Sequence, residues 1–215
     1  LVAIGLVAGL DYRSVGTDVH ALLQRMKLHP LFRQYLEGGE LVEWGAKTIP
    51  EGGYYSLPQR RSGNGVVILG DSAGFVEVAS LKGIHYAMMS GIYAARAIFR
   101  ALKAGDTSAE ALAEYDRLVN ESFIVKDLYE RRNMRLAFKD GFYAGGFKAS
   151  LMTVTKGAFP GAKIEVEADN RAPRVTGPTD TIPNDGGLTI SKVDAAFKSG
   201  NKTRDDIPSH LIIGQ

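Results

Sequence analysis

The chain has 215 residues, 45% of them hydrophobic and 23% charged, and its formal net charge at pH 7 is +2. This composition is typical of a soluble globular protein, and the small net charge argues against a nucleic-acid-binding protein, which is usually far more basic. Because the chain has no cysteine, it contains no disulfide, no thiolate nucleophile and no cysteine-held cluster, and its four scattered histidines do not suggest a zinc site.

The first ten residues, LVAIGLVAGL, are apolar but too few to span a bilayer, which takes about 20 residues. They also lack the basic start and the small-residue cleavage site of a signal peptide. Val, Ile and Leu that alternate with Gly and Ala predict a buried strand that begins in the middle of a fold. We therefore expect the chain to be a fragment whose N-terminal part precedes Leu1.

Two short helices are predicted next. Thr17 or Asp18 can cap a helix that runs to Lys27, because both side chains accept hydrogen bonds from first-turn amides. Pro30 ends that helix, since the residue before a proline is disfavoured in the helical region. The same proline suits the first turn of a second helix, PLFRQYLEGG, which the two glycines terminate.

Two strands should follow these helices. Residues 41–49, LVEWGAKTI, alternate apolar and polar side chains as a half-buried strand does. After a glycine-rich connection, Val66–Leu69 form a continuous apolar run bounded by turn residues, which predicts a buried strand. We expect this strand to be central in a sheet and to end at Asp71, converging on one cleft with a helix that begins at Gly83.

The second half of the chain should be mostly helical. Gly83–Leu102 is predicted to form one nearly uncharged helix, and Thr107 with Glu110 forms a capping box for the next helix, which continues to about Phe138. From about residue 163, prolines, aspartates and asparagines predict a mostly irregular tail with one short apolar piece, GLTISKVDAAF.

Between these regions, residues 141–161 are apolar and aromatic, with glycines too frequent for a stable isolated helix. Lysines lie near both edges of the segment, so it is the best candidate for an interfacial membrane patch. A buried helix packed through its glycines is the alternative.

The turn at Gly70 and Asp71 is a candidate ligand site, although the dipeptide alone is weak evidence. Helix N-terminal amides attract anions and oxygen-rich groups, and a carboxylate can accept hydrogen bonds from the hydroxyls of a polyol. Glycines also allow the backbone to come close to a ligand. A helix-capping aspartate in an ordinary turn is the alternative for this dipeptide taken alone.

The longer stretch GDSAGFVEVASLKGIHYAMMSGIYAARAI resembles the second flavin-contacting motif of glutathione-reductase-type flavoproteins. It is most similar to the branch that contains geranylgeranyl reductases and electron-transfer-flavoprotein:ubiquinone oxidoreductase. The residues that carry the resemblance are Gly70, Asp71, Gly83, Ser90, Gly91, Ala94 and Ala95.

The resemblance implies that Asp71 binds the ribityl chain of FAD and that the amides near Gly83 and Ile84 face the pyrimidine end of the isoalloxazine. The helix dipole would then stabilise negative charge on the reduced flavin. The implied cofactor-binding residues are Gly70, Asp71, Ser72, Gly74, Phe75, Gly83, Ile84 and His85. The resemblance implies no acid–base catalyst. The alternative for His85 is a place in the core, or behind the residues that touch the cofactor.

Four further segments narrow the family to electron-transfer-flavoprotein:ubiquinone oxidoreductase, because they resemble it in order and spacing. They are LVAIGLVAGLDY, RMKLHPLFRQYLEGGELVEWGAKTIPEGGYYSLP, YERRNMRLAFKDGFYAGG and DGGLTISKVDAAFKSGNKTRDDIPSHLIIG. In this family a GxGxxG dinucleotide motif and a Gly-Gly quinone-contacting segment would precede Leu1, and a domain with a four-cysteine [4Fe–4S] cluster would follow Gln215. Members of the family often lack the aspartate of the Gly-Asp pair and carry threonine where Ile84 stands.

The implied fold is α/β with an α+β insertion, a partial FAD/NAD(P)-binding-type domain combined with a quinone-type domain. Residues 1–60 would form part of the α+β quinone or substrate domain, and residues 61–138 the C-terminal half of the FAD domain. Residues 139–162 would be the apolar, membrane-contacting candidate. Residues 163–215 would be an extended tail that leads towards the iron–sulfur domain.

The resemblance implies that the intact enzyme passes electrons from electron-transfer flavoprotein, through FAD and the [4Fe–4S] cluster, to membrane ubiquinone. It would be a peripheral protein on the cytoplasmic face of a bacterial inner membrane, or on the mitochondrial inner membrane, and the fragment alone would be inactive. Two alternatives are a geranylgeranyl-reductase-like flavoenzyme that reduces isoprenoid double bonds, and a folded fragment that binds no cofactor.

Overall fold

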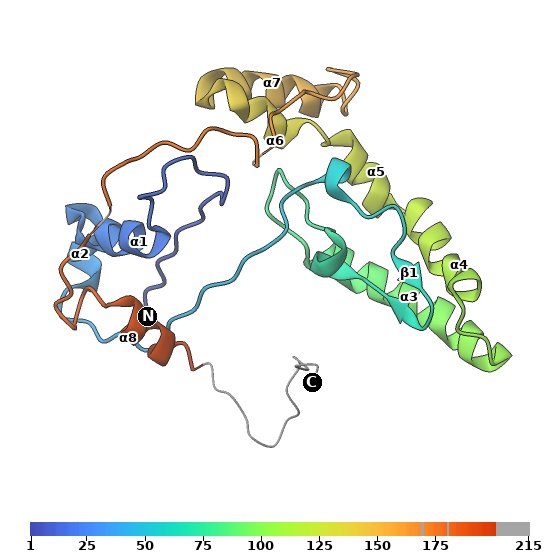
Figure 1. Ribbon diagram of the computed structural model, residues 1–215, viewed down its shortest axis with the longest axis horizontal. Helices are drawn as coiled ribbons and strands as arrows, with labels where there is room; N and C mark the ends of the chain where they lie inside the picture. Colours follow the sequence, from blue (N-terminus) through green and yellow to red (C-terminus); the bar gives the residue numbers. More distant parts are fainter. Residues whose placement is uncertain (169, 180, 201–215) are drawn as a thin grey trace. The chain divides into compact units, whose positions relative to one another are not determined.

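The computed structural model describes residues 1–168, 170–179 and 181–200. These residues belong to two compact units, which are treated separately below (Figure 1). Unit 1 combines Leu1–Lys47 with the chain from Glu167 onward, and unit 2 is Thr48–Val166. The predicted domain boundaries at residues 60, 138 and 162 do not coincide with this division and stay predictions.

Unit 1 contains the two predicted short helices, α1 (Val19–Leu28) and α2 (Pro30–Leu36). Asp18 is the N-cap of α1, and its carboxylate accepts a hydrogen bond from the amide of Ala21 at 3.2 Å. Lys192 pairs with the same carboxylate at 2.7 Å and lowers the pKa of Asp18. Pro30 occupies the first turn of α2. Both helices are therefore confirmed, and Asp18 rather than Thr17 is the cap.

The two strands predicted in unit 1, residues 1–10 and 41–49, are wrong. Both segments are irregular, and the pairing described nearby is a single parallel bridge between Ser14 and Val175. A strand is stabilised by hydrogen bonds to neighbouring strands, and no strand within the described residues pairs with either segment. The alternating pattern of these segments therefore did not lead to strands, because the described part of unit 1 contains no sheet for them to join.

The tail returns to pack on α1. The His20 ring lies 2.8 Å from the carbonyl oxygen of Ile190, and Gln24 accepts a hydrogen bond from the Ile190 amide at 3.1 Å. The helix α8 (Lys192–Lys198) follows and begins with a capping box made by Ser191 and Asp194. The predicted apolar piece, residues 187–197, therefore consists of a loop that packs on α1 and of most of the helix α8. The part of the predicted tail from residue 201 lies outside the described residues.

Lys27 lies buried on α1, and burial lowers the pKa of its ammonium group, while the Asp185 carboxylate opposes that shift. Between the lowered pKa of Lys27 and about 10.4, the unfolded chain binds more protons than the folded chain, so the free energy of unfolding should rise with pH across this window.

The substitution Lys27→Met keeps the length of the side chain and removes its charge. We expect it to raise the free energy of unfolding at pH 7 by about 1 kcal/mol and to flatten the pH profile. Urea unfolding from pH 7 to 10, with the exposed Lys47→Met as control, tests this. An unchanged pH profile would contradict it.

Unit 2 contains a short antiparallel hairpin of β1 (Ser62–Gly63) and β2 (Val66–Val67). The predicted buried central strand is therefore wrong in two respects, because β2 covers half of the apolar run and the side chains of Val66 and Leu69 are exposed. Within the described residues, β2 pairs with β1 alone, and no second sheet packs on this two-stranded sheet.

Helices form the rest of unit 2. In chain order they are α3 (Ile84–Ala104), α4 (Ala109–Asn120), α5 (Phe123–Glu130), α6 (Met134–Ala137) and α7 (Phe142–Val154), with the 3-10 turns η1 (Tyr54–Ser56), η2 (Gly70–Ala73) and η3 (Phe138–Asp140). The predicted helix after Gly83 is confirmed, and it ends at Gly105 in the left-handed conformation. The predicted capping box is wrong, because Ser108 caps α4. Ser122 caps α5 and divides the predicted long helix.

The core of unit 2 lies between α3, α4, α5 and the turn that precedes α3 (Figure 1). Its buried residues are Ala73, Phe75, Tyr86, Ala94, Ala97, Tyr115, Val119, Ile124 and Leu128. Small residues at regular helical spacing on α3 allow α4 to approach closely. The uncharged character of α3 therefore has a packing explanation as well as the flavin explanation that the sequence suggested.

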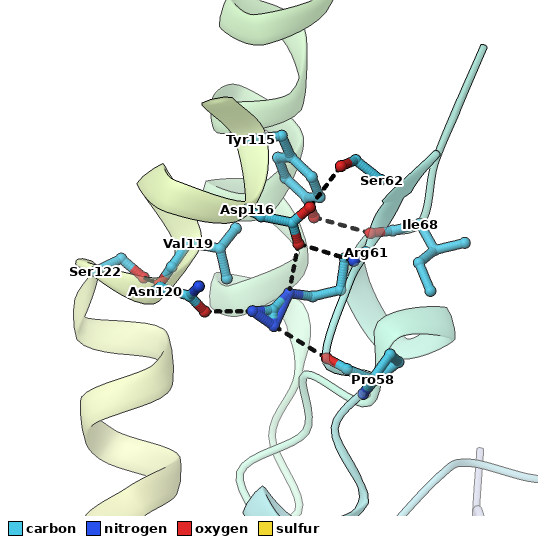
Figure 2. Close-up of polar contacts among 9 residues, drawn as sticks. All are labelled: Pro58, Arg61, Ser62, Ile68, Tyr115, Asp116, Val119, Asn120 and Ser122. Carbon is cyan, nitrogen blue, oxygen red and sulfur yellow. Dashed lines mark hydrogen bonds and ion pairs between the residues drawn. The ribbon is translucent and has the colours of Figure 1, made fainter. Parts of the chain in front are cut away.

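A buried polar network fastens the hairpin to α4 (Figure 2). The Asp116 carboxylate accepts hydrogen bonds from the Arg61 amide and the Ser62 hydroxyl and lies 3.4 Å from Arg61 Nε. The Arg61 guanidinium also donates to Asn120 Oδ1. Tyr115 donates its hydroxyl hydrogen to the carbonyl of Ile68 at 2.9 Å. The loop that leads to Gly70 is thereby held against a helix.

The glycine-rich segment forms the helix α7, which packs on η3. A Cβ on Gly145 would lie 2.7 Å from Phe138 Cα, so a glycine is required at this contact. Among the described residues, no helix is both long and apolar enough to cross a membrane, and no group of acidic residues or histidines forms a metal site. The FAD-binding-type fold stays a prediction.

Candidate functional site

The turn that carries Gly70 packs directly on the second turn of α3. Gly70 has a φ of +58°, and a Cβ there would lie 3.2 Å from the Cβ of Ala87. Its amide donates to the Ser90 hydroxyl at 3.0 Å, and that hydroxyl donates to the Ala87 carbonyl. Conformation and space therefore both favour glycine, and the motif residues Gly70 and Ser90 meet in the buried interior.

Gly74 closes the same turn. It adopts a left-handed conformation with φ of +79°, and its amide donates to the Asp71 carbonyl at 2.9 Å. The next residue, Phe75, is fully buried in the core of unit 2. The predicted site residue Phe75 therefore contributes packing, and its side chain is not available to a ligand at the surface.

Asp71 lies beside the N-terminus of α3. A Cβ built on Gly83 would lie 2.6 Å from Asp71 Oδ1, so the absence of a side chain at Gly83 leaves room for this carboxylate. Asp71 and Ser72 are both exposed, and within the described residues the Asp71 carboxylate makes no hydrogen bond or ion pair. Asp71 and Gly83 lie next to each other as predicted. The predicted position of Asp71 at the end of a central strand is wrong, because it lies in a 3-10 turn, and the shared cleft stays a prediction.

The N-terminus of α3 has free donors. Gly83 precedes the helix without a side-chain cap, and the first amide to bond back is that of Ala87, which donates to Gly83. The three amides between them have no partner within the helix. Ile84 is 79% exposed, and the exposed His85 ring lies 4.0 Å from the Tyr86 ring. These donors and the Asp71 carboxylate together suit a ligand with a hydroxylated chain and an electron-rich ring edge.

Two residues that the sequence did not indicate, Tyr86 in the first turn of α3 and Asp127 on α5, lie close to the N-terminus of α3. Tyr86 is fully buried, and its hydroxyl donates to Asp127 Oδ2 at 3.3 Å. Burial raises the pKa of Tyr86 well above its usual range, and the Asp127 carboxylate adds to the shift. The phenol therefore stays protonated and acts as a fixed donor that ties α3 to α5.

The loop between the turn and α3 is held by Glu77, a residue that sequence reasoning also missed. This side chain is buried, accepts hydrogen bonds from the amides of Ala79 and Ser80, and pairs with Arg131 at 3.0 Å. The available signal was a single acidic residue in the otherwise apolar run FVEVASL. Its partner Arg131 lies at the C-terminal cap of α5, a pairing that no local pattern predicts.

The helix α7 presents an aromatic surface. The side chains of Phe142, Tyr143 and Phe147 are all exposed, as is that of Val154 at the C-terminal end. Lys148 pairs with Asp140 at the edge of this surface. The helix therefore has one packed face, which includes the buried Gly145 and Met152, and one face of exposed aromatic side chains within unit 2.

The segment after α7 is fastened to the junction of α5 and α6. Arg132 lies 3.9 Å over the Tyr129 ring and donates to the carbonyl of Gly161. Asn133 donates to the carbonyls of Pro160 and Ala162 and accepts from the amide of Ile164. These contacts satisfy buried polar groups on both sides and fix where α7 lies in unit 2.

Comparison with known proteins gives a consistent family. A family model described as the ubiquinone-binding region of ETF-QO matches residues 1–49. The chain is 32% identical to the mitochondrial electron transfer flavoprotein-ubiquinone oxidoreductase of Caenorhabditis elegans and 36% identical to that of Arabidopsis thaliana, over 99% and 98% of its length. The human protein of the same name is 32% identical over 99% of the chain.

The chain spans 37%, 33% and 36% of the length of these three relatives, respectively. The predicted resemblance is therefore confirmed over nearly the whole of this sequence. The chain belongs to the electron transfer flavoprotein-ubiquinone oxidoreductase family.

Proposed function

We propose that this chain is the part of an electron transfer flavoprotein-ubiquinone oxidoreductase that holds the isoalloxazine side of FAD and contributes to the membrane and quinone region. The observation that carries the proposal is the exposed Asp71 carboxylate beside the uncapped N-terminus of α3, with Gly83 leaving room between them. The intact enzyme would oxidise electron-transfer flavoprotein and reduce ubiquinone.

The residues present fit FAD. Asp71 would accept hydrogen bonds from ribityl hydroxyls, and the backbone amides of Ile84 and His85 would face the pyrimidine end of the ring. The positive end of the α3 dipole favours negative charge at this place. FAD, when bound, supplies the electron-transfer chemistry. The chain's own task is to bind the cofactor, to orient it and to keep the exposed Ile84 side chain at the edge of the site.

Other partners follow from the family. The match of residues 1–49 to a ubiquinone-binding model supports ubiquinone as the acceptor, and the names of the relatives support electron-transfer flavoprotein as the donor. Any [4Fe–4S] cluster would be held outside these 215 residues, because they include no cysteine. Relatives named as mitochondrial support a mitochondrial location. The peripheral position on an inner membrane, mitochondrial or bacterial, is part of the proposal.

Two measurements test the function. Titration of the chain with FAD, followed by flavin fluorescence, should show saturable quenching. The full-length protein should oxidise reduced electron-transfer flavoprotein in the presence of a soluble ubiquinone analogue. If the full-length protein binds no FAD, or reduces isoprenoid double bonds instead of the quinone, the proposal is wrong. Binding by the full-length protein without binding by the chain alone would mean that this fragment cannot hold the cofactor by itself.

The aromatic surface of α7 would contact the membrane. Phe142 and Phe147 are 77% and 68% exposed, and transfer of one phenylalanine side chain out of water is worth about 2 kcal/mol. The double variant Phe142→Ser, Phe147→Ser should therefore bind vesicles of phosphatidylcholine and phosphatidylserine more weakly than the wild-type full-length protein, by roughly a hundredfold or more.

Co-sedimentation with these vesicles at low and high salt measures the effect. Phe99→Ser is the matched control, because Phe99 is 62% exposed on α3 of the same unit. Equal loss in the control variant, or a wild-type protein that stays in solution at both salt concentrations, would exclude α7 as the contact.

A further inference from the structure

We propose that Glu77 and Arg131 are a positioning pair for the flavin, which act by fixing the loop between Asp71 and the N-terminus of α3. The inference rests on the proposed function, since it concerns the same site. Neither residue needs to touch the cofactor. Their role would be to set where the helix amides and the Asp71 carboxylate lie with respect to each other.

The Glu77 carboxylate organises its own loop. Oε1 accepts a hydrogen bond from the Ala79 amide at 3.0 Å, and Oε2 accepts one from the Ser80 amide at 2.8 Å. The Glu77 backbone also pairs with Lys82, with N–O distances of 2.8 and 3.3 Å. Residues 77–82 are therefore closed into a tight loop, and the next residue is Gly83 at the start of the site.

The same loop stores backbone strain. Leu81 has a φ of +53°, a left-handed conformation that a non-glycine residue rarely adopts. Its side chain is 52% exposed, so burial of Leu81 does not explain the conformation. Strain of this kind, of order 1–3 kcal/mol, persists where the surroundings enforce it. The bonds to Glu77 are the contacts that enforce it here.

Arg131 holds Glu77 in place. Glu77 is 5% exposed and would be an uncompensated buried charge without a cation. Arg131 Nε lies 3.0 Å from Glu77 Oε1, and Arg131 is the C-terminal cap of α5, where the helix dipole favours a cation. The loop is thereby tied to a separate helix of the core.

Other groups close to Glu77 interact with its negative charge, which makes a neighbouring cation more favourable. The nearby Glu51 carboxyl has a buried oxygen, Oε1, without a hydrogen-bond partner. Burial raises the pKa of Glu51, which Arg135 opposes and Glu77 reinforces. Glu77 also adds to the raised pKa of Tyr86. A negative charge at Glu77 is thus felt by groups under the N-terminus of α3, and Arg131 is the cation in direct contact with it.

The test uses the full-length flavoprotein and three readouts: the dissociation constant for FAD, the visible spectrum of the bound flavin and its midpoint potential. We expect Arg131→Met and Glu77→Gln each to weaken FAD binding about tenfold and to shift the spectrum and the potential. The double variant should lose no more than the worse single variant, because both changes break one interaction. Arg131→Lys should restore part of the binding.

Arg117→Met is the matched control, because it breaks an exposed pair with Glu121 on α4 of the same unit. A purely structural pair would lower the melting temperature and leave FAD affinity, spectrum and potential as in the wild type, and that result would overturn the inference. If Asp71→Ala weakens FAD binding while the Glu77 and Arg131 variants do not, only this inference is wrong. If the wild-type protein binds no FAD, the proposed function and the inference both fall.

Discussion

Asp116→Ala is expected to lower the free energy of unfolding by about 3 kcal/mol, because it leaves a buried guanidinium without its carboxylate. Arg61 is 4% exposed, and Asp116 is its ion-pair partner and also accepts its backbone amide at 2.8 Å (Figure 2). The variant also removes the acceptor of the Ser62 hydroxyl. Asn120 and Pro58 continue to accept from the guanidinium, which places the loss near the low end for a broken buried pair.

Urea unfolding of the chain, followed by circular dichroism, measures this loss. Glu114→Ala is the control on the same helix, because Glu114 pairs with arginines that are mostly exposed, and we expect it to cost about 0.5 kcal/mol. Replacing both partners, with Arg61→Met and Asp116→Leu, should recover most of the stability. Equal losses for Asp116→Ala and Glu114→Ala would mean that the network is not buried in solution.

The second large effect is expected on the cofactor. A hydrogen bond to a charged group is worth roughly 1.5–3 kcal/mol, so Asp71→Ala should weaken FAD binding by the full-length protein on the order of ten- to a hundredfold. The fold should survive, because Asp71 is exposed and its carboxylate has no partner among the described residues. Flavin occupancy and thermal unfolding of the apoprotein separate the two effects. A capping role would instead reduce stability by about 1 kcal/mol and leave FAD affinity unchanged.

Gly83→Ala provides an independent check on the same geometry. Its Cβ would lie 2.6 Å from Asp71 Oδ1, so the carboxylate has to move away and FAD binding should fall as it does in Asp71→Ala. The double variant should be no worse than either single variant. Gly146→Ala is the control, because a Cβ at that helical glycine meets nothing within 4 Å, and FAD binding should be unchanged. Additive losses in the double variant would show that Gly83 and Asp71 act separately.

The sequence by itself determined the features that depend on neighbouring residues. A cap at Thr17 or Asp18, the start of α2 at Pro30 and the helix after Gly83 were predicted, because capping and helix initiation involve side chains within one turn, and the structure selects Asp18. The proximity of Asp71 to Gly83 was also predicted, since one loop joins them and the motif is continuous in the chain.

Only the tertiary structure decided where strands form and which buried charges meet. The apolar runs at residues 1–10 and 66–69 have the pattern of buried strands, but the first forms no strand and the second forms one only at Val66 and Val67, where β1 supplies the hydrogen bonds. In the same way, Glu77 could be noticed as an acid in an apolar run, yet its partner Arg131 lies at the C-terminal cap of α5. Hydrogen bonds between strands, and ion pairs such as Glu77 with Arg131, join residues far apart in the chain, so no local pattern encodes them.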